Sequence, residues 1–554
     1  MSKRPDMADQ EKAFEVHQGL ERRSFLKMAA GAAISAGTTS TVSSKTNLEV
    51  GSVTGLTNHR LQEVAKPLGN GESPALQFQA NPGGTGALLD KLWIADGGSP
   101  FHSDQIGIDP WIEPVPTDAA EIAFLPVHRL AALIRQRKIS SVELTEIYLE
   151  RMKRFDPILL CAVTVLEDKA YEEARRADSE LQSGKWRGPL HGIPWGVKDL
   201  FSVTGAPTTW GSEDFKNRVI DEDAELVVRL REAGAVLIAK LATGEFARGD
   251  NWYRGETRNA WNPDQGSSGS SAGPGSATAA GLVGFSIGTE TQGSIVGPSR
   301  RGGLSALRPT FGRISRHGGM VLSWSMDKPG PMCRSSKDCA LVFNAIHGSD
   351  EKDPSTLTAP FRFKENPDLS EMTIGYMPDA PESFLAKLRE LGASPQPMGS
   401  LPEGGSNALG VESSAAFDFY VAPDGKLEAV PESTEGEEAR PPRFHGGRSI
   451  SALDFVQSQR RRRILMQEMA EAMEGFDMFV TGSGETRLTN QTGHPAAVLP
   501  FDFGDSNSED EFKHEQPICT TIIGNLFADD KILSVSHLYQ SVTDWHQRHP
   551  PGLR

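Results

Sequence analysis

Cysteine is scarce in this chain, which has 554 residues and only four cysteines. They show neither a C-x-x-C motif nor the spacing of a metal-binding set. We therefore interpret them as buried packing residues or incidental thiols. The four positions are Cys161, Cys333, Cys339 and Cys519.

An excess of positive charge is also missing, because the formal net charge is −16. A nucleic-acid-binding surface needs a basic footprint, so we expect no nucleic-acid partner. No stretch reaches the ~18 apolar residues that a membrane-spanning helix requires. The length suits one very large domain or two to three ordinary ones.

The N-terminus carries features of an export signal. Arg22 and Arg23 precede the apolar run MAAGAAISAG, and a charged leader stands before them. This pattern is typical of a twin-arginine signal, although a disordered basic start that contains two arginines is the alternative. We predict a leader over 1–44, recognition by the twin-arginine export machinery, and a periplasmic or secreted protein. Such proteins fold before export, which suits the low cysteine content.

Residues 45–115 are rich in Gly, Pro, Ser and Asn, and we expect an irregular arm there. Regular structure is predicted from near Phe124. Ser140 and Glu143 form a capping-box pattern ahead of a helical repeat that continues to Phe155. Helices alternate with short apolar strands, for example AVLIA at 235–239, as in α/β proteins with a buried sheet.

The stretch from Asp264 to Thr310 is the most distinctive part of the sequence. Two Gly/Ser-rich segments enclose a small apolar run, Ala277 to Ile287. A flexible linker is one interpretation, but a linker would not enclose so apolar a run. We predict a buried helix and strand flanked by loops, in which glycine permits close approach to a ligand and serine supplies a hydroxyl.

A lysine follows another apolar strand, predicted over 193–197. Lys198 and Asp199 stand at the end of this strand. Burial disfavours the charged form of lysine and lowers its pKa, so Lys198 is a candidate base. The alternative is an ordinary surface pair of Lys198 and Asp199.

Six motifs occur in a fixed order over roughly 120–546. They are HGIPWGVKDLFSVTGAPTTWGS (191–212), GSSAG with GTETQGSI (269–273 and 288–295), LRPTFGRIS (307–315), TGHPA (492–496), PICTTIIGN (517–525) and HLYQSVTDWH (537–546). In sequence and order these motifs resemble the amidase signature family of serine amide hydrolases. The resemblance implies a three-layer α/β/α fold around a large mixed, twisted sheet, with an amidase domain over 116–548.

The resemblance also implies an activity and a catalytic site. The expected reaction is hydrolysis of a small-molecule carboxylic amide to the acid plus ammonia or an amine, without a metal or organic cofactor. Lys198 corresponds to the base and Ser294 to the nucleophile. The family places a bridging serine 24 positions before the nucleophile, at a cis peptide bond, which selects Ser270 rather than Ser267 or Ser268. The oxyanion-binding groups correspond to the backbone N–H groups of Thr291, Gln292, Gly293 and Ser294.

The sequence departs from the family pattern around the nucleophile. Gln292 stands where a glycine is usual, and Val296 replaces a frequent arginine. Glu290 replaces a common aspartate, and Ala272 replaces a glycine. None of these changes removes a catalytic atom, so we expect an active enzyme with an altered pocket.

Other functions fit parts of the sequence. Gly269 to Gly273 also matches G-x-S-x-G, which would make Ser271 the nucleophile of an α/β-hydrolase esterase with His494 or His537 as base. That interpretation requires a strand directly before Ser271, and the preceding residues resemble a loop. A catalytically inactive amidase-like binding protein is the non-enzymatic alternative. The family also includes one component of a tRNA-dependent amidotransferase, a role that export would prevent, and a homodimer is compatible with the sequence.

The C-terminal third varies most from the pattern. Residues 395–442 are predicted to form loops over the site, where the choice of substrate would reside. A helix is predicted over 449–473, and its basic run Arg460 to Arg463 is interpreted as a solvated face. A core strand is predicted over 476–480.

Overall fold

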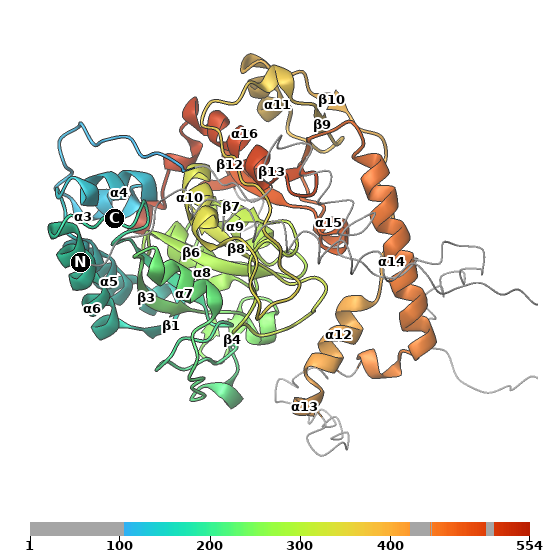
Figure 1. Ribbon diagram of the computed structural model, residues 1–554, viewed down its shortest axis with the longest axis horizontal. Helices are drawn as coiled ribbons and strands as arrows, with labels where there is room; N and C mark the ends of the chain where they lie inside the picture. The colour runs from blue at the N-terminus through green and yellow to red at the C-terminus, as the bar shows by residue number, and fades with distance from the viewer. Residues whose placement is uncertain (1–104, 422–443, 445, 506–514, 554) are drawn as a thin grey trace, which may run out of the picture. The chain divides into compact units, whose positions relative to one another are not determined.

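A mixed sheet runs through the described part of the chain (Figure 1). The computed structural model describes residues 105–421, 444, 446–505 and 515–553. Within these ranges the sheet has 11 strands in the order β1-β3-β2-β6-β8-β7-β12-β13-β11-β9-β10. The strands are β1 (Ala162–Val165), β2 (Pro194–Lys198), β3 (Val236–Leu241), β6 (Phe285–Glu290), β7 (Ser305–Arg308), β8 (Lys328–Cys333), β9 (Ile374–Tyr376), β10 (Gln396–Pro397), β11 (Met478–Thr481), β12 (Ala496–Asp505) and β13 (Glu515–Gly524), and β4 (Asn251–Trp252) pairs with β5 (Gly255–Glu256) in a separate hairpin.

Parallel and antiparallel pairs both occur, so the prediction of a large mixed sheet is confirmed. β2 lies parallel to both β3 and β6, and β9 lies parallel to β10 and β11. β8 runs antiparallel to β6, which places the start of β8 beside the end of β6. This junction of β2, β6 and β8 carries the candidate site described below.

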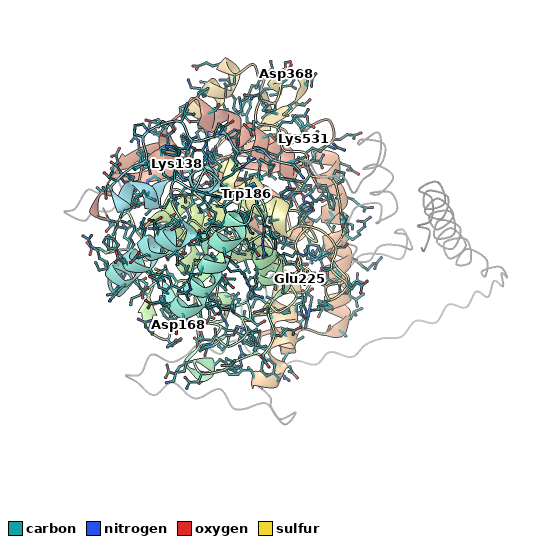
Figure 2. All side chains as sticks on the ribbon, turned by 60° about the vertical axis from the view of Figure 1, so that its left-hand side comes forward. Lys138, Asp168, Trp186, Glu225, Asp368 and Lys531 are labelled. Atoms are coloured by element: carbon teal, nitrogen blue, oxygen red, sulfur yellow. The ribbon has the colours of Figure 1, made fainter. Side chains whose placement is uncertain are left out.

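Helices cover both faces of the central strands. Every residue of β2, β3 and β8 is buried, and successive side chains of a strand point to opposite faces, so neither face is open to solvent. The outer sides of the helices and turns carry exposed charges, such as Lys138, Asp168 and Lys531 (Figure 2). The α-helices are α3 (Ala119–Phe124), α4 (Val127–Arg135), α5 (Ser141–Leu159), α6 (Glu167–Gln182), α7 (Glu225–Glu232), α8 (Ala272–Ala279), α9 (Val296–Gly302), α10 (Ser336–Ile346), α11 (Glu382–Glu390), α12 (Ala408–Ala416), α13 (Asp418–Val421), α14 (Ala452–Ala472), α15 (Thr486–Thr492) and α16 (Asp529–Ser541).

Local signals in the sequence locate several elements well. The capping box at the start of α5 forms as predicted, because the Ser140 hydroxyl accepts the Glu143 N–H and the Glu143 carboxylate accepts the Ser140 N–H. The apolar run within 277–287 forms parts of α8 and β6, both of them buried. Regular structure begins slightly earlier than predicted, at Ala119, where Asp118 caps α3.

One prediction about α14 is wrong. The sequence predicts a solvated face for its basic run, yet Arg462 and Arg463 are only 1% and 5% exposed. α14 packs against α12 and α15, and the Arg462 guanidinium is buried because it donates to the Gln491 carbonyl and to the Ser325 hydroxyl. The predicted twin-arginine leader and most of the predicted arm fall within 1–104 and lie outside the described residues, as do residues 422–443. The prediction of loops over 395–442 is wrong for part of its described portion, because α12 and α13 form there.

Candidate functional site

Lys198 ends β2 with its side chain wholly buried. Its amino nitrogen lies 2.8 Å from the Ser270 hydroxyl, 3.0 Å from the Ser271 hydroxyl and 2.9 Å from the Thr289 hydroxyl. Burial lowers the pKa of Lys198 well below its ordinary value, although the negative charges of Asp327 and Glu290 oppose the shift. A lysine that gives up its proton here can act as a base toward a neighbouring hydroxyl. The alternative of a surface Lys-Asp pair is wrong, and Asp199 instead pairs with buried Lys240 at 2.7 Å.

The two serines beside Lys198 have different surroundings. The Gly269–Ser270 peptide bond is cis, as the family resemblance implies. The Ser271 hydroxyl donates to the Thr289 carbonyl at 3.0 Å and accepts the Thr289 N–H at 3.1 Å. These two bonds fix the Ser271 hydroxyl against β6, whereas the Ser270 hydroxyl contacts the Lys198 amino nitrogen.

Ser294 lies in the turn between β6 and α9 and is half-buried. Its carbonyl accepts the Ser271 N–H at 3.2 Å, so the turn with Ser294 lies directly against the segment with Ser270. Gly293 has a φ of +92°, a conformation that favours glycine. Gln292 is exposed, so its side chain points away from the core while its N–H remains part of the turn.

A buried carboxylate holds this turn to the sheet. Glu290 accepts the N–H groups of Ile295 and Val296 at 2.8 and 2.9 Å. The same carboxylate pairs with Arg308 at 2.9 Å and accepts the Asn490 amide at 2.6 Å. Burial alone would raise the pKa of Glu290, but Arg308 and these hydrogen bonds outweigh it and lower the pKa to about 2. The glutamate is therefore ionised and fixes the end of the turn that follows Ser294.

A second carboxylate contacts the same turn from the other side. Asp327 accepts the Thr291 hydroxyl at 2.6 Å and the N–H groups of Leu322 and Ser323 at 2.8 and 2.9 Å. The side chain is buried, and burial raises its pKa. Thr291 is thus tied to the loop that precedes β8.

The esterase alternative lacks its structural requirement. Residues 257–271, all described, contain no strand but only a bridge between Arg258 and Gly266, whereas a nucleophile elbow follows a strand directly. His494 is buried, and burial lowers its pKa to about 3, while its ring contacts Thr492 at 2.8 Å. His537 lies on α16, and burial lowers its pKa to about 4. Among the described contacts, the side-chain partners of the Ser271 hydroxyl do not include a histidine.

Sequence reasoning missed three residues that shape the site. Thr289 contacts Lys198 from within the distinctive Gly/Ser-rich stretch, so its hydroxyl near the end of β6 could have indicated it. Asp327 and Asn490 come from distant segments. A single sequence contains no signal for such contacts, because they arise only when β8 and α15 pack beside β6.

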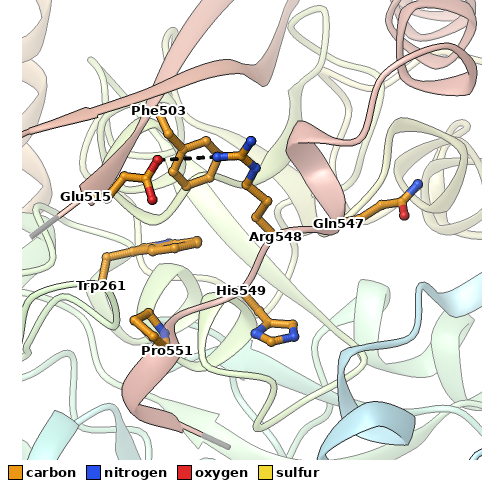
Figure 3. Close-up of a pocket in the computed structure, with 7 residues that line it drawn as sticks. All are labelled: Trp261, Phe503, Glu515, Gln547, Arg548, His549 and Pro551. Carbon is orange, nitrogen blue, oxygen red and sulfur yellow. Dashed lines mark hydrogen bonds and ion pairs between the residues drawn. The ribbon is translucent and has the colours of Figure 1, made fainter.

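The cavities of the protein differ in their relation to this site. A small cavity of about 20 Å³ is lined by Thr289, Thr291 and Asp327 together with apolar residues such as Met320. A larger pocket of about 380 Å³ lies at the C-terminal segment, where Arg548 pairs with Glu515 at 3.3 Å and stacks over Phe503 (Figure 3). None of the predicted site residues lines the larger pocket, so of these two only the small cavity adjoins the candidate site.

The described residues meet neither the requirements of a membrane-spanning helix nor those of a metal site. No helix there combines the length and the apolar character needed to cross a bilayer. The same residues include no group of three or more His, Cys, Asp or Glu side chains arranged to hold a metal ion.

Comparison with known proteins places the chain in a family. The Amidase family model matches residues 143–487. The relative from Marinomonas sp., a glutamyl-tRNA(Gln) amidotransferase component, is 32% identical over 485 residues, which cover 76% of this chain and 98% of that protein. A relative from Methylococcus capsulatus with the same name is 31% identical over 493 residues, with 76% of this chain and 98% of that protein covered.

Solved structures agree with this assignment. Native peptide amidase from Stenotrophomonas maltophilia has 27% identity and a TM-score of 0.64, covering 77% of this chain and 98% of the other. An amidase family protein from Bacillus anthracis has 26% identity and a TM-score of 0.67, covering 78% and 93%. The chain therefore belongs to the amidase family and is a hydrolase that acts on amide C–N bonds.

Proposed function

We propose that the protein hydrolyses a carboxylic amide through a Ser–Ser–Lys triad in which Ser294 is the nucleophile. Ser270 relays the proton and Lys198 is the base. The observation that carries the proposal is the 2.8 Å contact between the fully buried Lys198 nitrogen and the Ser270 hydroxyl, beside the turn that contains Ser294. Serine needs such a base because its hydroxyl is a weak nucleophile at its own pKa.

The first step of this mechanism is the attack of Ser294 on the amide carbonyl. Neutral Lys198 accepts the Ser270 proton while Ser270 accepts the Ser294 proton. The Ser294 oxygen bonds to the amide carbon, and the carbonyl π electrons move onto oxygen. The N–H groups of Thr291, Gln292, Gly293 and Ser294 stabilise this oxyanion.

Collapse of the tetrahedral intermediate completes the first half-reaction. The oxyanion re-forms the carbonyl and the C–N bond breaks. Protonated Lys198 gives a proton to Ser270, and Ser270 passes its own proton to the leaving nitrogen. The acyl group is now an ester of Ser294. Water attacks this ester with the same relay as base, and the carboxylic acid leaves as Ser294 regains its proton.

Fluorophosphonate labelling followed by peptide mapping tests the assignment. We expect an adduct on Ser294 in the wild-type protein and its loss in both Ser294→Ala and Lys198→Ala. An adduct on Ser271 would instead favour the esterase. Full labelling and full amide hydrolysis in Lys198→Ala would contradict the triad, and an absence of both in the wild type would favour the inactive binding protein.

A second candidate is the role of an amidotransferase component. The 32% identity to a protein of that name, over nearly its whole length, supports it. Such a component would release ammonia from an amide donor for transfer to another acceptor. The two roles separate in an assay of the isolated chain, since an independent amidase releases free ammonia from simple amides without partner proteins.

Export is part of the proposal and rests on Arg22 and Arg23 ahead of an apolar run. Fractionation of a bacterium that expresses the full chain tests it. We expect the protein outside the cytoplasm in the wild type and inside it when both arginines are replaced by lysine. If the wild type and the double-lysine variant were divided in the same way between the cytoplasm and the exterior, export would no longer be part of the proposal.

A further inference from the structure

A buried chain of hydrogen bonds connects the turn before Ser294 to helices α12 and α14. It begins at Thr291, whose hydroxyl donates to Asp327 at 2.6 Å. The Asp327 carboxylate also accepts the N–H groups of Leu322 and Ser323. One buried carboxylate therefore joins the turn at the site to the loop 322–327.

Helix α12 holds the same loop through Glu412. The Glu412 carboxylate accepts the Ser323 hydroxyl at 2.6 Å, the Ser325 hydroxyl at 2.7 Å and the Ser325 N–H at 3.0 Å. All three contacts are buried. The loop is thus fixed at two serines by a residue that is 87 positions or more away in the sequence.

Helix α14 completes the connection through Arg462. Its guanidinium donates to the Ser325 hydroxyl at 2.5 Å, to the Ser325 carbonyl at 2.9 Å and to the Gln491 carbonyl at 2.8 Å. Because Arg462 is only 1% exposed, water has little access to these bonds. The arginine and Glu412 therefore hold Ser325 from two helices.

We infer that Asp327 is a positioning residue for the oxyanion-binding turn, and that Glu412 and Arg462 act through the loop 322–327 to hold Asp327 in place. The inference rests on the proposed function, since it assigns a task to Thr291 in that reaction. Asp327 does not touch the reacting atoms. It fixes the rotamer of Thr291 and with it the peptide whose N–H faces the developing oxyanion.

The geometry explains why such a tether matters. The turn 291–294 contains Gly293 at a positive φ and an exposed Gln292, and its first residue, Thr291, is held through the Asp327 carboxylate. Glu290 fixes the turn at Ile295 and Val296. Asp327 supplies the constraint at the opposite end. An oxyanion donor displaced by about 1 Å loses much of its effect on the rate.

The first test is the rate of fluorophosphonate labelling of Ser294 in Asp327→Asn. The matched control is Asp529→Asn, because Asp529 is also buried and also accepts a threonine hydroxyl, that of Thr310 at 2.9 Å, together with the Thr310 N–H at 2.8 Å. We expect Asp327→Asn to lower the maximal labelling rate roughly 10- to 100-fold, with the concentration for half-maximal rate changed by less than about threefold. Asp529→Asn should lose comparable thermal stability yet label at the wild-type rate.

A double-mutant cycle shows whether Asp327 acts through Thr291. Thr291→Val should reproduce the loss seen in Asp327→Asn, Thr291→Ser should retain most of the rate, and the double variant Thr291→Val/Asp327→Asn should be no slower than the worse single variant. Additive losses, or a wild-type rate in Asp327→Asn, would overturn the inference. A loss of equal size in Asp529→Asn would overturn it too, since general destabilisation would then be the cause.

The contribution of α12 is tested by the labelling rate of Glu412→Gln. The control is Glu173→Gln, because Glu173 is also buried and accepts the Leu237 N–H at 2.9 Å in another part of the protein. We expect slower labelling only in Glu412→Gln, and equal rates in both would remove Glu412 from the inference. Failure of the proposed function is distinguishable, because the wild-type protein would then show no adduct on Ser294. Failure of the inference leaves the wild-type adduct intact.

Discussion

A methyl group on Gly288 would lie 2.8 Å from the hydroxyl oxygen of Ser271. It would also lie 2.7 Å from the Met332 sulfur, so there is no room for a side chain at this point of β6. Gly288→Ala should therefore displace the Ser271 hydroxyl from Lys198 and destabilise the fold by about 1–3 kcal/mol. Labelling of Ser294 and the urea midpoint should both fall. Gly410→Ala on α12, where nothing lies within 4 Å, is the control and should be neutral or stabilising.

Thr289 supplies one of the three hydroxyl contacts of Lys198, at 2.9 Å. Thr289→Val keeps the shape of the side chain and removes this partner. Lys198 becomes charged when it accepts the proton, and a hydrogen bond to a charged group contributes about 1.5–3 kcal/mol. We therefore expect a loss of roughly 10- to 100-fold in kcat/KM. Thr289→Ser should restore most of the activity. A wild-type rate in Thr289→Val would show that the Lys198 contacts to the two serines suffice.

The pH dependence of labelling follows from the state of Lys198. The base works only when neutral, so the rate should rise with pH and level off above the pKa of Lys198. Because burial lowers this pKa well below its ordinary value, the plateau should begin well below pH 10. In Lys198→Ala, any residual labelling should not rise with pH in this way. An acid limb that survives unchanged in Lys198→Ala would assign the titration to another group.

Glu290 should make the fold sensitive to acid. Its pKa in the folded protein is about 2, against an ordinary value of 4.5, so its stabilisation is fully present above pH 4.5 and is lost as the pH falls toward 2. A shift of this size corresponds to about 3 kcal/mol at neutral pH. Glu290→Gln should therefore lower the urea midpoint strongly at pH 7 and much less near pH 3. Replacement of exposed Glu371 by glutamine should change neither midpoint.

Gln292 offers a way to probe the mouth of the site. Its side chain is exposed, while its backbone N–H belongs to the oxyanion-binding turn in the proposed mechanism. Gln292→Ala keeps the N–H, so the maximal rate with a small amide should change less than about threefold. The KM values for large amides should change more than those for small amides. A parallel loss of kcat for every amide would place Gln292 in the chemistry itself.

The sequence predicts the parts of the fold that depend on local signals. The capping box at Ser140, the buried run within 277–287 and the strand that ends at Lys198 all appear where expected. Each of these depends on residues close together in the chain, for which periodicity and capping are sufficient.

The tethers of the site could not be predicted in the same way. Asn490 contacts Glu290 across 200 residues, and Glu412 contacts Ser325 across 87. The prediction for Arg462 was wrong for a related reason. Four consecutive arginines predict a solvent-exposed helix face, and the sequence does not show that Arg462 bonds to Ser325. Tertiary packing decides which members of a charged run become buried.

Glu290 and Asn490 are 200 residues apart in the sequence, so the site can be complete only after these distant segments have packed together. Contacts this distant in sequence form late, because a long loop must close first. A ribosome-bound chain that ends before Asn490 has Lys198 and both serines but has no partner from α15 for Glu290. The time at which Ser294 becomes reactive toward a fluorophosphonate therefore reports when this late stage of folding is complete.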